Sequence, residues 1–442
     1  MFQLLKQSKK SRARLGLLTT PHGSIETPFF MPIATKGSVK ALDSSDIKAL
    51  SAPIILANTY HLYLQPGLEV LKKFGGLHKF MGWDGPILTD SGGYQVFSLG
   101  NKFNHRSSIV IPDLIGNPEK NRNKKELDPR VSPALAGSPE PARNASHSDA
   151  GGDDNVLNSL VKINQSGVEF RSFIDGSKHL FTPEKVQKIQ DIIGADIKMV
   201  LDICSPHPCF KHQAELDLQL THEWAKRALE YHQKHYCRGR ACLRPGNLKG
   251  CPYPSLFGIV QGSIYKDLRI KSAKFLSSLD FDGLAIGGLA VGEDNKKMYQ
   301  VLDYTIPELP TDKPRYLMGV GKPENIIEAV KRGVDMFDCV IPTREARHGR
   351  LYLYKKSNIK NKKLNANFYE VVNILNSKYK KDTKPLDKNC DCKLCQNYSA
   401  GYLHHLFKAG EPLALRLATL HNVSFYLKLM KSIRTNIKTN RF

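Results

Sequence analysis

Short apolar runs rich in Val, Ile, Leu and aromatic residues recur along most of the chain. Each run ends in Gly, Asn, Asp, Gln or a similar turn residue and is followed by a stretch with helical spacing. The runs are short and nearly continuous in their apolar character, as expected of strands that are buried on both faces of a sheet. We predict eight such strands, at residues 27–33, 54–58, 86–90, 197–202, 256–261, 283–288, 315–319 and 335–340.

Segments with an apolar repeat every three to four positions separate several of these strands. The predicted helices lie at residues 45–51, 183–193, 221–233, 266–279 and 323–332. Strands that alternate with helices form parallel sheets, and eight repeats of the unit close a barrel. The sequence therefore predicts an α/β protein, a (β/α)8 barrel of the TIM type, with any active site at the carboxyl ends of its strands.

Two stretches interrupt this alternation. Residues 101–158 are rich in Pro, Ser, Asn, Gly and charge, which predicts a long disordered insertion. Residues 236–254 carry Cys237, Cys242 and Cys251, which lack the close paired spacing of a metal site, so loop cysteines are the favoured interpretation. We expect a catalytic barrel over residues 1–365, with these insertions, and a zinc-binding subdomain with C-terminal helices over residues 366–442.

The charge of the chain adds an expectation about its partner. With 65 Lys and Arg against 42 Asp and Glu, the formal net charge is +23, which favours a polyanion such as nucleic acid. The alternative places the excess in solvated loops, such as the lysine-rich stretch at 355–363. No apolar run approaches the roughly 20 residues of a membrane span, and no signal peptide is evident, so we expect a soluble, cytoplasmic protein.

Three cysteines near the C-terminus have the spacing of metal ligands. Cys390, Cys392 and Cys395 fall within six residues, and nine cysteines in all do not suggest a disulfide framework. A fourth ligand can come from His421, which begins a segment with helical spacing at 421–433, while His404 and His405 compete by position alone. Three thiolates and an imidazole close a tetrahedral shell, which predicts one structural Zn²⁺ per subunit.

Four predicted strands end in polar residues that could do chemistry: Asp90, Asp202, Gln261 and Asp338. A single Asp after a strand is more often a turn residue or a helix cap. Four of them at one barrel rim favour a functional site. Two carboxylates that face one substrate can divide the work between attack on an anomeric carbon and proton transfer, which suggests glycosyl transfer.

Five longer motifs extend these strand ends. They are Asp-Ser-Gly-Gly-Tyr-Gln from Asp90, Gly-Ile-Val-Gln-Gly from Gly258, Gly-Gly-Leu-Ala-Val-Gly-Glu from Gly287, Tyr-Leu-Met-Gly-Val-Gly from Tyr316 and Phe-Asp-Cys-Val from Phe337. In sequence and order they resemble bacterial tRNA-guanine transglycosylases, over nearly the whole chain outside the two insertions. The cysteine spacing resembles the zinc motif of that family, and this resemblance selects His421 as the fourth ligand.

The resemblance implies an activity. Such enzymes exchange the wobble guanine of tRNAs with GUN anticodons, those for aspartate, asparagine, histidine and tyrosine, on the route to queuosine. The incoming base is 7-aminomethyl-7-deazaguanine. By similarity, Asp338 is the nucleophile that forms a covalent intermediate with the RNA, and Asp90 is the proton acceptor. Asp335, three residues earlier, is the competing carboxylate, but the motif places the nucleophile directly before Cys-Val. The resemblance also implies a homodimer.

The resemblance extends to binding residues. Those expected to bind the base are Asp90, Ser91, Gly92, Gly93, Tyr94, Asp202, Gln261, Gly288, Leu289 and Met318. Among them, Asp202 would accept from the N1–H and the exocyclic amine, and Tyr94 and Met318 would stack on the ring. Those expected to bind RNA are Gly319, Val320, Gly321, Lys322, Pro323, Glu324, Asn325, Thr343, Arg344, Glu345, Ala346 and Arg347.

One position departs from the family pattern. Ile203 follows Asp202 where bacterial members usually have Glu. Because a charged aminomethyl group would lose an acidic neighbour, salvaged queuine is the alternative incoming base. Two other classes of function compete: an inactive RNA-binding homologue, which would not be expected to retain Asp90 and Asp338, and a sugar hydrolase, which would not account for the positive charge or the zinc motif.

Overall fold

The computed structural model describes residues 2–96, 161–236, 253–355 and 368–442. The predicted insertion at 101–158 lies outside the described residues, as do Cys237, Cys242 and Cys251. Within the described ranges, no helix is both long and apolar enough to cross a membrane.

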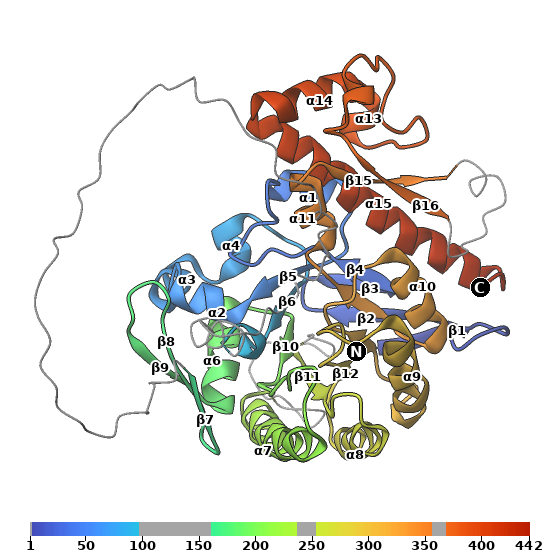
Figure 1. Ribbon diagram of the computed structural model, residues 1–442. Coiled ribbons are helices and arrows are strands. Elements are labelled where there is room, and N and C mark those ends of the chain that lie inside the picture. The colour runs from blue at the N-terminus through green and yellow to red at the C-terminus, as the bar shows by residue number, and fades with distance from the viewer. Residues whose placement is uncertain (1, 97–160, 237–252, 356–367) are drawn as a thin grey trace, which may run out of the picture.

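The centre of the molecule is a parallel sheet of eight strands, as predicted (Figure 1). An isolated parallel bridge between Ile33 and Leu56 joins the two edges and closes the barrel. In order around the barrel the strands are β4 (Phe29–Met31), β14 (Met336–Asp338), β13 (Arg315–Leu317), β12 (Gly283–Ile286), β11 (Ser255–Val260), β10 (Ile197–Met199), β6 (Ile87–Asp90) and β5 (Ile55–Asn58). The (β/α)8 prediction is confirmed, with strands slightly shorter than expected.

Helices surround this sheet, and their ends follow local sequence signals. The helix α6 (Pro183–Ile193) begins with Pro at its first position, after Thr182 caps the Lys185 N–H, and ends at Gly194 in the left-handed conformation. The other barrel helices are α1 (Ser44–Ala49), α7 (Lys211–His235), α8 (Lys266–Ser277), α9 (Asn295–Thr305) and α10 (Pro323–Arg332). Bounds for α6 and α10 match the prediction, whereas α7 begins earlier than predicted and α9 was not predicted.

Further elements lie between or before the barrel strands. Two three-stranded antiparallel sheets here were not predicted: β1 (Phe2–Gln7), β2 (Arg14–Thr20) and β3 (Gly23–Thr27), and β7 (Val161–Asn164), β8 (Gly167–Arg171) and β9 (Lys178–Phe181). A two-stranded antiparallel sheet in the C-terminal part was not predicted either. Short helices complete the loops: α2 (Thr59–Leu64), α3 (Leu68–Phe74), α4 (Leu77–Met81), η1 (Ile306–Glu308) and α11 (Ile341–Arg347). These segments are short or half-exposed, so their apolar spacing carries little signal.

The C-terminal part is built around one long helix, α15 (Pro412–Lys438), which runs along the barrel in Figure 1. The predicted helix at 421–433 is therefore the middle of a longer one. The Tyr426 hydroxyl donates to the Gly321 carbonyl (2.6 Å), and Arg434 donates to the Pro28 carbonyl (2.8 Å), which fixes α15 against the barrel. The other elements of this part are β15 (Arg350–Tyr354), β16 (Tyr369–Asn373), η2 (Ser377–Tyr379), α13 (Lys393–Asn397) and α14 (Ala400–Ala409), of which β15, α13 and α14 contact α15.

A buried ion pair joins the N-terminal sheet to the amino ends of the barrel strands. Arg14 on β2 lies 2.5 Å from the Asp335 carboxylate, and the two side chains are 3% and 0% exposed. Arg14 also donates to the carbonyls of Thr311 and Lys313, and Asp335 accepts from the Arg315 N–H (2.8 Å). Asp335, the competing carboxylate, is therefore engaged in structure just before β14 begins, whereas Asp338 ends that strand.

We predict that Arg14→Met lowers the free energy of unfolding by about 3–5 kcal/mol, because it leaves Asp335 charged, buried and without its cation. Urea denaturation at pH 7 measures this loss. The double variant Arg14→Met/Asp335→Leu removes both charges and should regain most of the stability. If the unfolding midpoint of Arg14→Met equals that of the wild type, the Arg14–Asp335 ion pair does not stabilise the fold as we expect.

Candidate active site and metal centre

Asp90 lies at the carboxyl end of β6, in register with Asn58 at the end of β5. The Asn58 side-chain amide donates to one carboxylate oxygen (2.6 Å), and the Thr59 N–H donates to the other (3.1 Å). Burial raises the pKa of Asp90 to about 7 despite these donors, and the charge of Asp338 adds to the shift. At neutral pH, Asp90 is therefore poised to gain or lose a proton.

Asp338 ends β14 and is only 8% exposed. The Tyr316 hydroxyl (2.6 Å) and the Gly319 N–H (2.8 Å), both from the neighbouring β13 segment, donate to its Oδ1. Burial raises the pKa of Asp338, and these two donors oppose the shift. Because both of these donors engage Oδ1, Oδ2 is the oxygen that can be presented to a substrate.

A third carboxylate, Asp202, follows β10 and is buried. Its Oδ2 accepts from the Gln261 side-chain amide (2.7 Å), and its Oδ1 accepts from the Ser91 hydroxyl (3.3 Å). Burial raises the pKa of Asp202 to about 6, so the carboxylate is still mostly ionised at pH 7. The Gln261 carbonyl oxygen is buried and has no partner among the described residues. This cluster thus offers acceptors for the polar edge of a ligand.

The loop after β12 passes close to Gln261. A Cβ atom at Gly288, whose φ is +63°, would lie 2.3 Å from the Gln261 carbonyl oxygen, so this position requires glycine. The fully buried Arg269 of α8 holds the loop by donating to the carbonyls of Gly287 (2.8 Å) and Gly288 (3.1 Å). Glu293 accepts from the N–H of Ala290 and of Val291. The backbone around Leu289 is therefore held firmly beside Gln261.

Sequence reasoning did not single out Asn58, Tyr316 or Arg269. Asn58 could have been found from the register of neighbouring strands, because it pairs with Asp90. Tyr316 pairs with Met336, two residues before Asp338, so the register alone does not identify it. Arg269 lies within a helix and carries no comparable signal. Of the expected stacking residues, Tyr94 is half exposed and Met318 is partly buried.

The residues expected to bind RNA include both solvent-accessible and buried ones. Gly319 and Lys322 are exposed, and Glu324, Arg344 and Arg347 are partly exposed. The remaining seven are buried: Val320, Gly321, Pro323, Asn325, Thr343, Glu345 and Ala346. Asn325 accepts from the Tyr299 hydroxyl (2.7 Å). The buried members thus shape the two segments, and the accessible ones can meet a polyanion.

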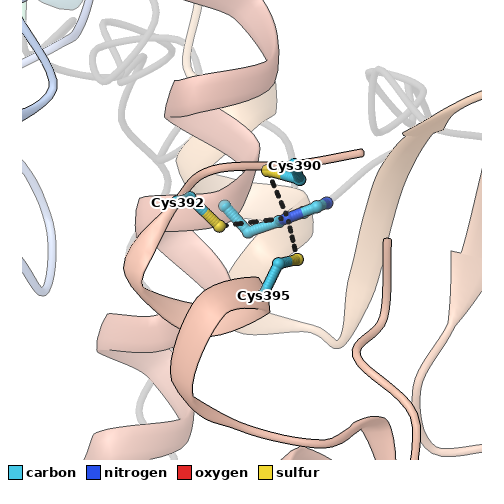
Figure 2. A group of neighbouring side chains, drawn as sticks. Cys390, Cys392 and Cys395 are labelled. Atoms are coloured by element: carbon cyan, nitrogen blue, oxygen red, sulfur yellow. Dashed lines mark hydrogen bonds between the residues drawn. The ribbon is translucent and has the colours of Figure 1, made fainter. Parts of the chain in front are cut away.

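Figure 2 shows the three cysteines Cys390, Cys392 and Cys395 converging on one imidazole nitrogen. Their sulfurs lie 3.7, 3.5 and 3.4 Å from Nδ1 of His421, and all four residues are buried. The predicted set therefore comes together. His404 instead contacts the Ile374 carbonyl, and His405 is exposed.

The surroundings of this cluster suit a zinc ion. Nε2 of His421 lies 2.8 Å from the Tyr352 carbonyl, so a proton on Nε2 leaves Nδ1 free to bind metal. The Lys428 ammonium lies 3.6 Å from the Cys390 sulfur, where it offsets thiolate charge. Three sulfurs and one nitrogen form a complete tetrahedral shell, so an ion here would join the 390–395 loop to α15 and take no part in chemistry.

A closed parallel barrel with buried carboxylates at its strand ends is typical of barrel enzymes, and the Cys3His cluster has the ligands to hold a metal ion beside it. A family model described as queuine tRNA-ribosyltransferase matches residues 8–114 and 143–442. The chain belongs to this family, whose members are pentosyltransferases. The unmatched stretch, 115–142, falls inside the predicted insertion.

Curated relatives named queuine tRNA-ribosyltransferase match the full length. Proteins from Caldanaerobacter subterraneus and Desulforamulus reducens are each 44% identical to this chain, over 440 and 436 residues. A protein from Thermoanaerobacter pseudethanolicus is 43% identical over 440 residues. The aligned regions cover 99–100% of this chain and 94% of each relative. The resemblance to the transglycosylase family is thus confirmed.

We predict that Cys392→Ser lowers the zinc content from one ion per chain to near zero and lowers the thermal midpoint, because the 390–395 loop loses its link to α15. Metal analysis and thermal unfolding measure both effects. Cys209→Ser, which removes a cysteine outside the cluster, is the matched control and should keep its zinc. A Cys392→Ser variant with full zinc and an unchanged midpoint would show that the cluster is not a metal site.

Proposed function

We propose that this protein exchanges the wobble guanine of tRNAs with GUN anticodons for 7-aminomethyl-7-deazaguanine by double displacement. The observation that carries the proposal is a pair of carboxylates, Asp90 and Asp338, which end two strands at the same rim of the barrel, where the charge of Asp338 raises the pKa of Asp90. Their hydrogen-bond surroundings differ, so they can take different roles in one reaction.

In the first displacement, Oδ2 of Asp338 attacks C1′ of the ribose and forms a C–O bond. The bond from C1′ to N9 of guanine breaks, and its electron pair leaves with the base. The Tyr316 hydroxyl and the Gly319 N–H orient the carboxylate through Oδ1. Protonated Asp90 can supply the proton that the leaving base needs.

In the second displacement, N9 of the incoming base attacks the same carbon while its proton passes to ionised Asp90. The C–O bond to Asp338 breaks, and the carboxylate is regenerated. Two inversions preserve the configuration at C1′, as in retaining glycosidases. The intermediate also conserves the energy of the glycosidic bond, so no nucleotide cofactor is needed.

Base recognition would use the cluster around Asp202. Its ionised carboxylate can accept from N1–H and the exocyclic amine of a guanine-like base, replacing the bond it now accepts from Gln261. Gln261 and the Gly288 N–H would read the opposite edge, and Leu289 would offer its carbonyl to the aminomethyl group. Ser91, Gly92 and Gly93 line the approach, and Tyr94 and Met318 would stack on the flipped base.

The remaining proposals concern partners and organisation. Lys322, Arg344 and Arg347, the accessible cations of the two expected RNA segments, would contact phosphates, consistent with a net charge of +23.

We place the catalytic barrel at 1–365 and the zinc subdomain at 366–442. A cytoplasmic homodimer remains part of the proposal, and equilibrium sedimentation would test its stoichiometry.

We predict that Asp338→Asn abolishes the covalent adduct between protein and tRNA, because an amide oxygen is a poor nucleophile. Denaturing gels of protein mixed with a substrate tRNA measure the adduct. Asp335→Asn is the matched control and should still form it, and Asp338→Ala should fold normally. An adduct that persists in both Asp338 variants would refute the assignment of Asp338 as the nucleophile, whereas the absence of an adduct with the wild type would favour the inactive RNA-binding homologue or the hydrolase.

The identity of the incoming base is a separate prediction. Ile203 is 4% exposed and packs within an apolar cluster, so it brings no charge near the site. We expect the wild type to prefer 7-aminomethyl-7-deazaguanine over queuine, because the backbone around Leu289 is retained. Competitive incorporation of the two bases into tRNA measures the preference. The variant Ile203→Glu introduces a carboxylate at this position, and Ile203→Leu is its uncharged control. A strong preference for queuine would overturn this choice of base but not the exchange reaction.

A further inference from the structure

A second group of potential metal ligands lies far from the catalytic carboxylates in the fold. His22 is in the turn between β2 and β3, His78 is in α4, and Asp196 precedes β10. Nδ1 of His22 lies 2.7 Å from Oδ1 of Asp196, and Nε2 of His78 lies 3.3 Å from Oδ2. We propose that these three residues form a binding site for a divalent transition-metal ion, distinct from the Cys3His centre.

The carboxylate of Asp196 is held in place by the backbone and still has capacity to bind. It is 1% exposed. Its Oδ1 accepts from the His22 N–H (3.1 Å), and its Oδ2 accepts from the Ile87 N–H (2.8 Å). Each carboxylate oxygen therefore accepts one hydrogen bond from the backbone and also contacts one imidazole. Outer hydrogen bonds of this kind orient metal-ligating carboxylates.

The two imidazoles are stacked, with ring centroids 3.7 Å apart and planes 18° from parallel. The two rings therefore lie side by side, and each directs one nitrogen toward a different oxygen of Asp196. A metal ion bound between these groups would take both ring nitrogens and the carboxylate as ligands together.

The donor set selects the class of ion. Two imidazoles and one carboxylate suit Zn²⁺, Co²⁺, Ni²⁺ or Cu²⁺, whereas Mg²⁺ and Ca²⁺ prefer oxygen ligands. The separation of 3.3 Å matches the edge of about 3.3 Å in a tetrahedron with zinc–nitrogen bonds of normal length, whereas the 2.7 Å contact is a hydrogen bond that would lengthen when an ion binds. Nε2 of His78 also donates to the Gly85 carbonyl (3.0 Å), a bond that the ion would replace, and His22 is partly open to solvent, so water can complete the shell.

The position in the barrel assigns this site a role in stability. Ile87 begins β6 and Asp196 precedes β10, so the cluster lies at the amino ends of strands whose opposite ends carry Asp90 and Asp202. That face of a barrel serves stability rather than catalysis. A bound ion would clip the β2–β3 turn and α4 to the barrel, and the folded protein would gain stability with metal concentration.

Titration with Co²⁺ of the full-length protein that carries one zinc ion per chain, in the Cys3His cluster, tests the proposal. We expect one additional Co²⁺ per chain, with weak visible absorption that lacks a sulfur-to-cobalt charge-transfer band, and a thermal midpoint that rises with Co²⁺. His22→Gln should weaken this uptake by about tenfold or more. His212→Gln, which removes an exposed histidine from α7, should bind as the wild type does.

Three outcomes would overturn the proposal: no additional equivalent of Co²⁺, an added ion whose spectrum shows sulfur ligation, or unchanged uptake in His22→Gln. The base-exchange activity of His22→Gln should equal that of the wild type, which verifies that the variant is folded. His78→Gln provides a second loss of a ligand from a different element. Failure of the Co²⁺ test leaves the proposed catalytic function untouched, because no residue of this cluster acts in it.

Discussion

Closure of eight parallel strands is the constraint on which the rest of the structure depends. Parallel pairing sends every carboxyl end to the same rim, so residues from distant parts of the chain meet there. Asp90, Asp202 and Asp338 reach that rim from β6, from the segment after β10 and from β14. The strands are buried, so the same closure that gathers these carboxylates also removes them from water. Burial raises the pKa values of all three, and the charge of Asp338 adds to the shift at Asp90.

The differences among these carboxylates come from their immediate donors. Asp338 is held through one oxygen by Tyr316 and Gly319, which leaves the other available for attack. Asp90 has a pKa near 7, raised by burial and by the charge of Asp338, which suits a group that exchanges protons. Asp202 faces Gln261 and Ser91, which suits recognition of a base. The proposed nucleophile, proton carrier and recognition group thus differ in their hydrogen-bond partners.

Much of this arrangement could be predicted from the sequence, because buried strands and catalytic motifs leave local signals. The bounds of α6 and α10 follow from Pro at the start and Gly at the end. The Cys3His set follows from the spacing of three cysteines together with a family resemblance. The sheet β7–β9 escaped prediction because its strands are short and half-exposed. The cluster of His22, His78 and Asp196 could not be predicted, since only the folded chain brings a hairpin turn, a helix and a strand start together.

The central claim is that one carboxylate, Asp90, serves both displacements in opposite protonation states. Rapid-quench measurements of adduct formation and of adduct discharge by the incoming base, each across pH 5–9, test it most directly. The account predicts that formation slows as pH rises, with the change centred near 7, the pKa of Asp90. Discharge accelerates as pH rises, with its change centred at a lower pH, because Asp338 carries no charge in the adduct and no longer raises the pKa of Asp90. Asp90→Asn should flatten both profiles. Two steps that change in the same direction with pH would contradict the account.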